Sequence, residues 1–151
     1  MSMDSATTLV SKIKGYNPDV NCGVVSSAYE FARKAHHGQL RASGDPYITH
    51  PLQVADILAD MRLDQASIIT ALLHDVVEDS AWTCKQLRAQ KFSVEIIEAI
   101  DALTRRRGEP YDSLIERAAL NPLALQVKLA DLEGSIWWDL TGSAFTEQHG
   151  I

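Results

Sequence analysis

The segment from Ala71 to Asp79 places four side chains that could do chemistry, His74, Asp75, Glu78 and Asp79, among apolar residues. If the segment is one helix, the four fall within an arc of roughly 140°, at about 100° per residue. Three carboxylates this close repel one another, and burying them unpaired costs several kcal/mol per charge. A bound cation would turn that repulsion into ligation. The alternative is a solvated acidic helix end.

Two residues elsewhere in the chain are the best candidates to complete a metal site. His50 stands before Pro51 at an expected helix start, and Asp131 lies in the apolar segment 127–132. A mixed site rich in oxygen ligands suits Mn, Fe or Mg better than a thiolate zinc site. Each candidate has an alternative: His50 as a capping or hydrogen-bonded histidine, and Asp131 as the ion-pair partner of Lys128.

The composition is that of a soluble globular protein. Its 151 residues are enough for one domain spanning 1–151 with a proper core. The net charge of −6 argues against nucleic acid or an anionic membrane as a partner. Cys22 and Cys84 have no metal-binding spacing, which indicates reduced thiols and a cytoplasmic location. We find no signal pattern and no apolar run of membrane-spanning length.

Apolar residues at helical spacing and capping signals predict helices throughout the chain. Glycine and proline make the segment 38–47 a polar loop, and 105–108 is a basic loop. No segment alternates with period two and ends in a hairpin turn, so the class is all-α. The expected helices cover 5–14, 24–37, a stretch opening at Pro51, one capped by Asp64 and ending in 71–79, a short one capped by Thr83 with Gln86, 93–104, 110–120, and a last one after Asn121-Pro122.

Three blocks carry a resemblance to a known family. His36 to Pro51 resembles the H-x-G-Q-x-R-x-S-G-x-P-Y-I-x-H-P signature of RelA/SpoT-type hydrolase domains. Leu73 to Asp79 is similar to that domain's L-H-D-V-V-E-D, and Val127 to Asp131 to its V-K-L-A-D. The wider group is the HD-domain metal-dependent phosphohydrolases. The resemblance covers about residues 20–135, with a short helix before it and a tail after it, and is closest to the stand-alone small alarmone hydrolases.

The resemblance implies a single helical HD bundle with the metal site between helices. It implies hydrolysis of the 3′-pyrophosphate of (p)ppGpp, the alarmone of the stringent response, to GDP or GTP. A divalent ion lowers the pKa of bound water, and carboxylates one turn away can handle its proton. The implied ligands of a Mn²⁺ ion are His50, His74, Asp75 and Asp131, and the same ligands would also accept Fe²⁺. Glu78 and Asp79 are implied to act on the nucleophilic water, without a division of roles between them. Arg41 and Ser43 are implied to bind the nucleotide.

Further cations and two departures bear on the substrate. Lys128 and Arg105 to Arg107 are candidates to bind the pyrophosphate, although a solvated basic loop also explains the arginines. Ser135 stands where the family commonly has an asparagine that contacts the nucleotide, and Ala42 where many members have lysine. These departures keep two alternatives open. One is a phosphohydrolase for another nucleotide, such as the 2′-phosphate of NADPH, and the other is a nucleotide-binding sensor without turnover.

Overall fold

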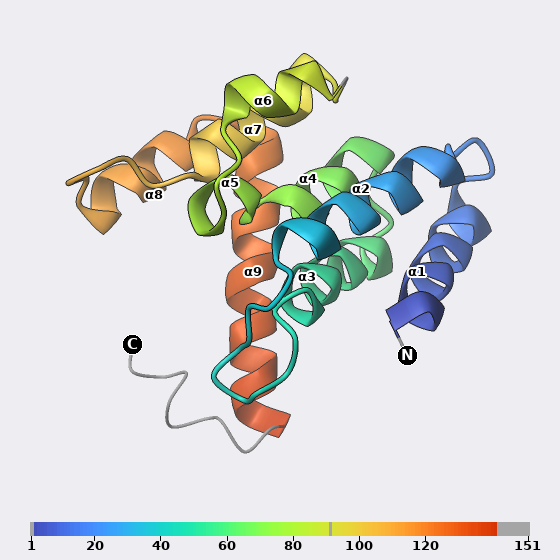
Figure 1. The fold of residues 1–151 in the computed structure, drawn as a ribbon. Coiled ribbons are helices and arrows are strands. Elements are labelled where there is room, and N and C mark those ends of the chain that lie inside the picture. The colour runs from blue at the N-terminus through green and yellow to red at the C-terminus, as the bar shows by residue number, and fades with distance from the viewer. Residues whose placement is uncertain (1, 91, 142–151) are drawn as a thin grey trace.

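The computed structural model describes the backbone of residues 2–90 and 92–141 and the side chains of 6–90 and 92–132. These residues form helices and no β-strand, with one isolated bridge between Leu40 and Pro46, so the all-α class is confirmed. No described helix is long and apolar enough to cross a membrane. The helices are α1 (Ser2–Tyr16), α2 (Cys22–Ala35), α3 (Thr49–Asp60), α4 (Gln65–Leu73), α5 (Val76–Asp79), α6 (Cys84–Ala89), α7 (Val94–Leu103), α8 (Tyr111–Ala119) and α9 (Pro122–Thr141) (Figure 1).

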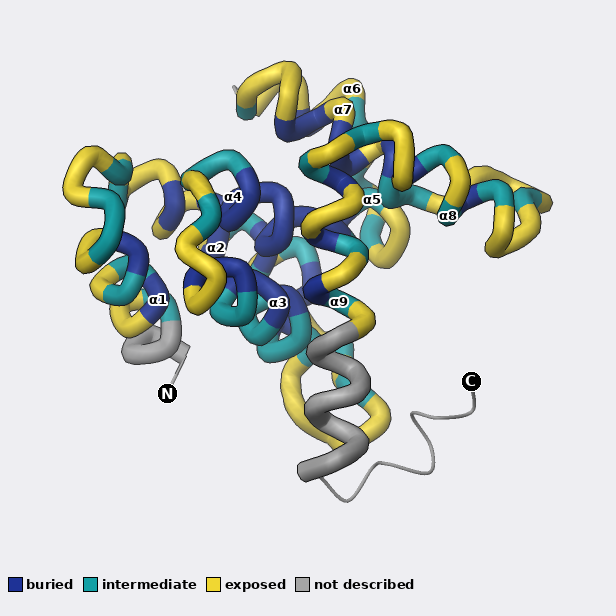
Figure 2. The backbone as a smooth tube through the Cα atoms, turned by 180° about the vertical axis from the view of Figure 1, so that it is seen from behind, coloured by how far each residue is buried: buried dark blue, intermediate teal, exposed yellow. Residues whose placement is uncertain are grey.

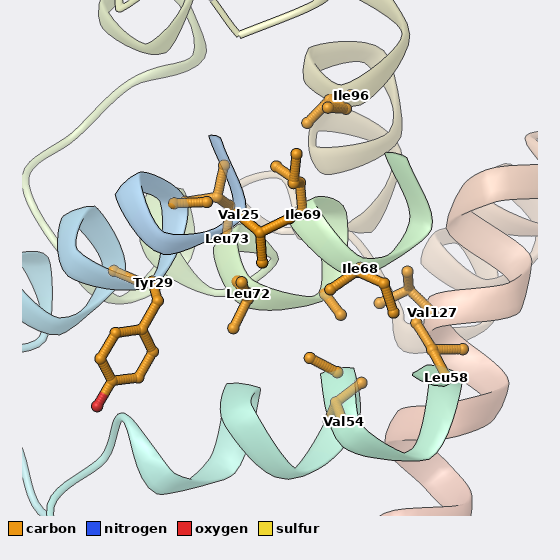
Figure 3. Packing of buried hydrophobic residues seen from close by; sticks show 14 of the residues in the cluster. Val25, Tyr29, Val54, Leu58, Ile68, Ile69, Leu72, Leu73, Ile96 and Val127 are labelled. Atoms are coloured by element: carbon orange, nitrogen blue, oxygen red, sulfur yellow. The ribbon is translucent and has the colours of Figure 1, made fainter. Parts of the chain in front are cut away.

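Helix α4 is the centre of the fold. Every residue from Ser67 to Leu73 is buried, and the helix packs against α2, α3, α7 and α9 (Figure 2). A helix that is apolar on all sides is stable only when other elements surround it. Figure 3 shows Ile68 and Leu72 of α4 among side chains from these neighbours, including Val54 of α3 and Val127 of α9. This core fixes the end of α4, from which the chemistry-bearing segment begins.

Local capping signals set several helix starts where the sequence predicts them. The Asp64 carboxylate accepts a hydrogen bond from Ser67 N at 3.0 Å and caps α4. Thr83 and Gln86 form the expected capping box, and the Ser93 hydroxyl accepts from the backbone at the start of α7. The Asn121 side chain does the same for α9. Each cap satisfies a backbone N–H that has no partner within its helix.

The prediction of one continuous helix through 71–79 is wrong. Helix α4 ends at Leu73, a turn holds His74 and Asp75, and the four-residue α5 follows. The ring Nδ1 of His74 bonds the carbonyl of Ala71 at 2.6 Å, which is the carbonyl that the backbone N–H of residue 75 would use in a continued helix. The break sends the His74 and Asp75 side chains towards α3 and α9 instead of along a shared face with Glu78 and Asp79.

The connection between α7 and α8 lies over this break and is held by Arg117. Its guanidinium donates to the carbonyls of Asp101, Ala102 and Thr104 at 2.9 to 3.2 Å. It also pairs with Glu109 at 2.6 Å, with both side chains mostly buried. The last carbonyls of α7 lack helical partners, so one arginine caps the helix and closes the following loop. Residues 104–110 are thereby fixed beside α5 and α9.

Candidate metal centre and catalytic site

Two histidines and an aspartate from separate elements meet at the break after α4. His50 is the second residue of α3, and His74 and Asp75 form the turn between α4 and α5. One ligand atom from each of the three lies within 4.8 Å of the other two. The Nε2 atoms of His50 and His74 lie 3.6 Å and 3.2 Å from Asp75 Oδ2. These atoms form a cluster that could hold a divalent metal ion.

The orientation of His74 fits a metal ligand. Because its Nδ1 bonds a backbone carbonyl, Nδ1 carries the hydrogen, and the lone pair of the neutral ring is on Nε2. The side chain is 5% exposed, and its buried Nε2 makes no hydrogen bond of suitable geometry among the described residues, although Asp75 Oδ2 lies 3.2 Å away. A buried polar nitrogen without a partner is unfavourable, and an ion between the three side chains would satisfy it. The residues present therefore fit a divalent cation.

In the absence of a metal ion, a proton on His74 balances part of the negative charge of the cluster. Burial alone would lower the pKa of His74, but the negative charges of Asp75 and Asp131 outweigh it and raise that pKa to about 9. Burial would likewise raise the pKa of Asp75, yet the contacts with His74 and Tyr47 hold it well below its usual range. The cluster thus has a net preference for positive charge between its carboxylates.

Tyr47 holds the carboxylate of Asp75 from the opposite side. Its hydroxyl donates to Asp75 Oδ2 at 2.6 Å, and its ring lies against the rings of His36 and His50. Burial and the charge of Asp75 raise the pKa of Tyr47, so the hydroxyl stays a donor. A hydrogen bond of this kind to a ligating carboxylate orients it and usually contributes to metal affinity.

Asp131 of α9 joins the cluster through His50. Its Oδ1 lies 2.9 Å from His50 Nε2, whereas the three-residue group above does not include it. Its Oδ2 lies 3.7 Å from Lys128 Nζ, one turn earlier on α9, so the ion pair weighed as an alternative is also present. Burial opposes ionisation of Asp131, but the hydrogen bond with His50 and the charge of His74 lower its pKa. A fourth ligand role for Asp131 stays a prediction.

A cavity of about 230 Å³ opens beside this cluster. His74, Asp75 and Asp131 form one side of it. Two cations, Lys128 and Arg105, also line it, at 5.3 and 5.7 Å from the ring centroid of Tyr111. Cations at this distance are attracted to an aromatic ring. The remaining lining residues are Glu78, Leu103, Tyr111 and Leu114.

The two acids of α5 are held differently from each other. Glu78 lines the cavity, and its Oε1 accepts a hydrogen bond from the backbone N–H of Arg105 at 2.8 Å. Asp79 is held through its main chain, where its carbonyl accepts from Gln39 Nε2 at 2.7 Å. Partial burial and the charge of Asp75 raise the pKa of the Asp79 carboxyl. One carboxylate therefore faces the cavity, and its neighbour has an increased tendency to hold a proton.

The expected nucleotide-binding residues lie farther out. Arg41 Nη1 donates to Thr49 Oγ1 at 3.4 Å, and Ser43 Oγ donates to the side chain of Asp45 at 3.0 Å. Neither is among the lining residues of the 230 Å³ cavity, in contrast to Lys128. Ala42 is exposed beside them. Ser135 belongs to α9, four residues after Asp131, and its side chain lies outside the described part of the structure.

Sequence reasoning assigned no role to Tyr47, Gln39 or Tyr111. Tyr47 and Gln39 belong to the first block that resembles the family, and their place in that block was the one sequence feature that could have pointed to them. Their partners lie 28 and 40 residues further along the chain, so spacing could not identify them. Tyr111 follows Pro110 at a helix start, which predicts a helix and says nothing about a cation partner.

The comparisons with known proteins agree with this arrangement. A family description of the HD domain matches residues 28–118. A protein called "Probable GTP pyrophosphokinase" from Mycobacterium leprae is 39% identical over 132 residues, which are 82% of this chain and 17% of that protein. "GTP pyrophosphokinase rsh" from Brucella melitensis is 47% identical over 134 residues, 82% of this chain and 18% of that protein. The chain thus matches less than a fifth of these relatives.

A solved structure shares the fold. It is described as a metazoan ortholog of SpoT that hydrolyzes ppGpp, and it matches with a TM-score of 0.68 over 79% of this chain and 71% of its own length. At 24% sequence identity, that likeness shows the helical architecture alone. That residues 1–151 form a single domain stays a prediction. The chain belongs to the HD-domain family, and the resemblance of its motifs to RelA/SpoT-type domains is confirmed.

Proposed function

We propose that this protein hydrolyses the 3′-pyrophosphate of (p)ppGpp in a metal-dependent reaction, giving GDP or GTP and pyrophosphate. The observation that carries the proposal is the convergence of His50, His74 and Asp75, with the buried Nε2 of His74 directed at Asp75 Oδ2 at 3.2 Å and no hydrogen bond completed there. This cluster lines a cavity together with two cations, Lys128 and Arg105. A cation site with further cations in the same small cavity suits a substrate with several phosphate charges.

His50, His74, Asp75 and Asp131 would hold the ion, which we propose to be Mn²⁺, with Fe²⁺ as the other ion that suits these ligands. When bound, such an ion supplies a nucleophilic water near neutral pH and neutralises charge on the phosphate. The fixed tautomer of His74 and the hydrogen bond from Tyr47 to Asp75 orient two of the ligands before any ion arrives.

Glu78 and Asp79 would divide the proton transfers. Glu78 lines the cavity beside the metal cluster, so we assign to it the acceptance of a proton from the attacking water. The water oxygen bonds to phosphorus, the bond from phosphorus to the ribose 3′-oxygen breaks, and that oxygen must gain a proton. The raised pKa of Asp79 suits the residue that donates it. The two acids are neighbours whose charges interact, so a pKa obtained from the pH dependence of the rate would describe the pair and not one residue.

Lys128 and Arg105 would bind the pyrophosphate, and Arg41 would stack on the guanine base, with Ser43 and Ser135 completing the contacts to the nucleotide. The names of relatives support a guanine nucleotide as the substrate. Two are called GTP pyrophosphokinases, and the solved structure with the same fold is described as a ppGpp hydrolase. The match covers less than a fifth of the pyrophosphokinases, so their activities come to this chain only as part of the proposal.

A second candidate is removal of the 2′-phosphate from NADPH. It is favoured by the outer part of the site, where Ala42 is exposed without a charge and Ser135 replaces the asparagine that the family commonly has. A serine has one hydroxyl, whereas asparagine offers an amide donor and acceptor. Base and ribose recognition would change while the chemistry at phosphorus stayed the same.

One experiment separates these functions. Protein reconstituted with Mn²⁺ is incubated with ppGpp, NADPH and ordinary nucleotides, with and without EDTA, and the products are resolved by chromatography. We expect GDP and pyrophosphate from ppGpp, with no products in EDTA. Phosphate and NADH from NADPH alone would favour the second candidate. Binding of ppGpp without products would identify a sensor, and both enzymatic proposals would then fail.

A further inference from the structure

Gln39 joins the polar loop to the end of α5. Its Nε2 donates a hydrogen bond of 2.7 Å to the backbone carbonyl of Asp79, 40 residues away in sequence. Asp79 is the last residue of α5, and carbonyls at the end of a helix have no partner within it. This bond fixes where the main chain of Asp79 lies, and therefore the point from which its carboxylate extends.

His36 keeps the Gln39 amide in the donating orientation. Its Nδ1 lies 3.0 Å from Gln39 Oε1, and the histidine is only 2% exposed. Because the Gln39 NH₂ group donates to the carbonyl of Asp79, the amide oxygen faces His36, and Nδ1 must carry the hydrogen. Rotating the amide by 180° would set oxygen against oxygen at Asp79. The three groups therefore admit one hydrogen-bond arrangement.

The backbone around Gln39 is fixed as well. Gly38 has φ of +83°, a conformation that residues with a Cβ rarely adopt, and it turns the chain between His36 and Gln39. The Gln39 N–H donates to the His36 carbonyl at 2.9 Å, and its own carbonyl accepts from Tyr47 N at 2.9 Å. With both backbone groups bonded, the Gln39 side chain has little conformational freedom left to lose in reaching Asp79.

Helix α5 needs an external support of this kind. It has four residues, too few to be stable by itself. The N–H of Asp79 bonds the carbonyl of Asp75, and its exposed carboxylate lies beside the Tyr47 hydroxyl, which donates to Asp75. Without the Gln39 contact, the end of α5 loses its tie to the loop, and a hydroxyl already bonded to Asp75 is left to hold the Asp79 carboxylate. A misplacement of about 1 Å can lower a rate by about 10²-fold.

We propose that Gln39 is a positioning residue for Asp79, with His36 holding the Gln39 amide in its donating orientation. The role given to Asp79 rests on the proposed function, whereas the contact itself does not. The competing explanation is that Gln39 only ties the polar loop to the core. The two differ in which quantity a substitution changes: the rate of the chemical step, or the binding of substrate and metal.

Gln39→Leu tests the inference, with Gln90→Leu as the matched control on an exposed glutamine at the end of α6. We expect Gln39→Leu to lower kcat by about 10- to 100-fold, with KM and Mn²⁺ affinity unchanged. Gln39→Glu keeps the size and the acceptor for His36 but loses the donor, so it should show the same loss if the leucine variant does not fold. In an Asp79→Asn background, Gln39→Leu should have no further effect.

Equal losses from Gln39→Leu in both backgrounds, or a change in KM or Mn²⁺ affinity with kcat unchanged, would overturn the inference. Hydrogen exchange separates its failure from that of the proposed function, because it requires no turnover. Amides of residues 76–80 should exchange faster in Gln39→Leu than in Gln90→Leu. Unchanged exchange there would show that the contact does not hold α5. If the wild-type protein hydrolyses no substrate but this difference is present, the proposed function fails and the positioning contact stands.

Discussion

The metal cluster and the polar loop are neighbours in space but are built in different ways. His74 is 5% exposed, and each of its neighbours His50, Asp75 and Asp131 contacts another member of the cluster. Along the loop, every residue from Ala42 to Pro46 is exposed. Substitutions in the cluster leave buried charges unpaired, whereas substitutions in the outer loop meet water. The cluster is thus constrained by its buried charges, whereas the exposed residues 42–46 of the loop can be replaced without unpairing any of them.

Removing a cluster carboxylate should have the largest effect. Asp75→Asn keeps the shape but removes the charge that pairs with His74 and accepts from Tyr47. We expect Mn²⁺ binding to be lost and kcat/KM for ppGpp to fall by about 10³-fold or more, because the ion contributes several kcal/mol. Metal content by mass spectrometry and a product assay measure both. A variant that kept metal and full activity would exclude Asp75 as a ligand.

Glu78→Ala should distinguish a role of Glu78 in proton transfer from a role in metal binding. Its carboxylate contacts the Arg105 backbone N–H and no member of the cluster in any described contact. We expect kcat to fall by about 10²-fold with the metal retained, since general-base catalysis typically contributes that much. Isothermal titration with Mn²⁺ and steady-state kinetics test the two halves. Loss of the metal in this variant would instead place Glu78 among the ligands.

The protonation of His74 predicts how the cluster responds to pH. In the metal-free protein its pKa is about 9, and an ion binds only the neutral ring. Mn²⁺ affinity should therefore increase by roughly tenfold per pH unit from pH 7 towards 9. Titration of the metal-free protein at a series of pH values measures this slope, and an affinity that did not change with pH would contradict it.

The same group predicts the stability of the metal-free protein. A pKa raised above the value of 6.5 in the unfolded chain stabilises the fold fully below pH 6.5, and this stabilisation is lost as pH rises through 9. Thermal unfolding in EDTA should show a lower melting temperature at pH 9 than at pH 6.5. Saturating Mn²⁺ should remove or reverse this trend, because the ion binds the neutral ring that high pH favours.

Arg41→Ala should have the smallest effect of the series and should be confined to substrate binding. Arg41, on the polar loop, contacts Thr49 at the start of α3 and lies outside the lining of the 230 Å³ cavity. We expect KM for ppGpp to rise by about tenfold, which is the loss expected for one stacked cation. The value of kcat and the Mn²⁺ affinity should not change. A fall in kcat with an unchanged KM would show that the loop takes part in the chemistry.

Local sequence signals account for much of the fold. The caps at Asp64, Thr83 and Ser93 each act over three residues, so spacing alone identifies them. The break after Leu73 was not predicted, because the bond of the His74 ring to the carbonyl of Ala71 competes with a helix that the apolar pattern favours. Helical periodicity cannot register such a competition between a side chain and the backbone.

The candidate site divides in the same way. Residue types predicted His50 and Asp131 as partners of His74 and Asp75, and the structure brings His50, His74 and Asp75 together with Asp131 beside His50. Contacts that cross the fold were out of reach: Tyr47 with Asp75, Gln39 with Asp79, and Arg105 with Glu78. Each links segments separated by 27 to 40 residues, and their meeting depends on the packing of whole helices around α4.

The bond from Arg105 to Glu78 comes from a backbone amide, so it does not depend on which side chain residue 105 carries. Any amino acid except proline could supply it. Position 105 can therefore mutate through many side chains facing the cavity while Glu78 keeps its partner. If the proposed reaction is correct, substrate preference could evolve there in single steps without a loss of chemistry between them. It is the first position we would randomise in a library designed to change the proposed nucleotide preference.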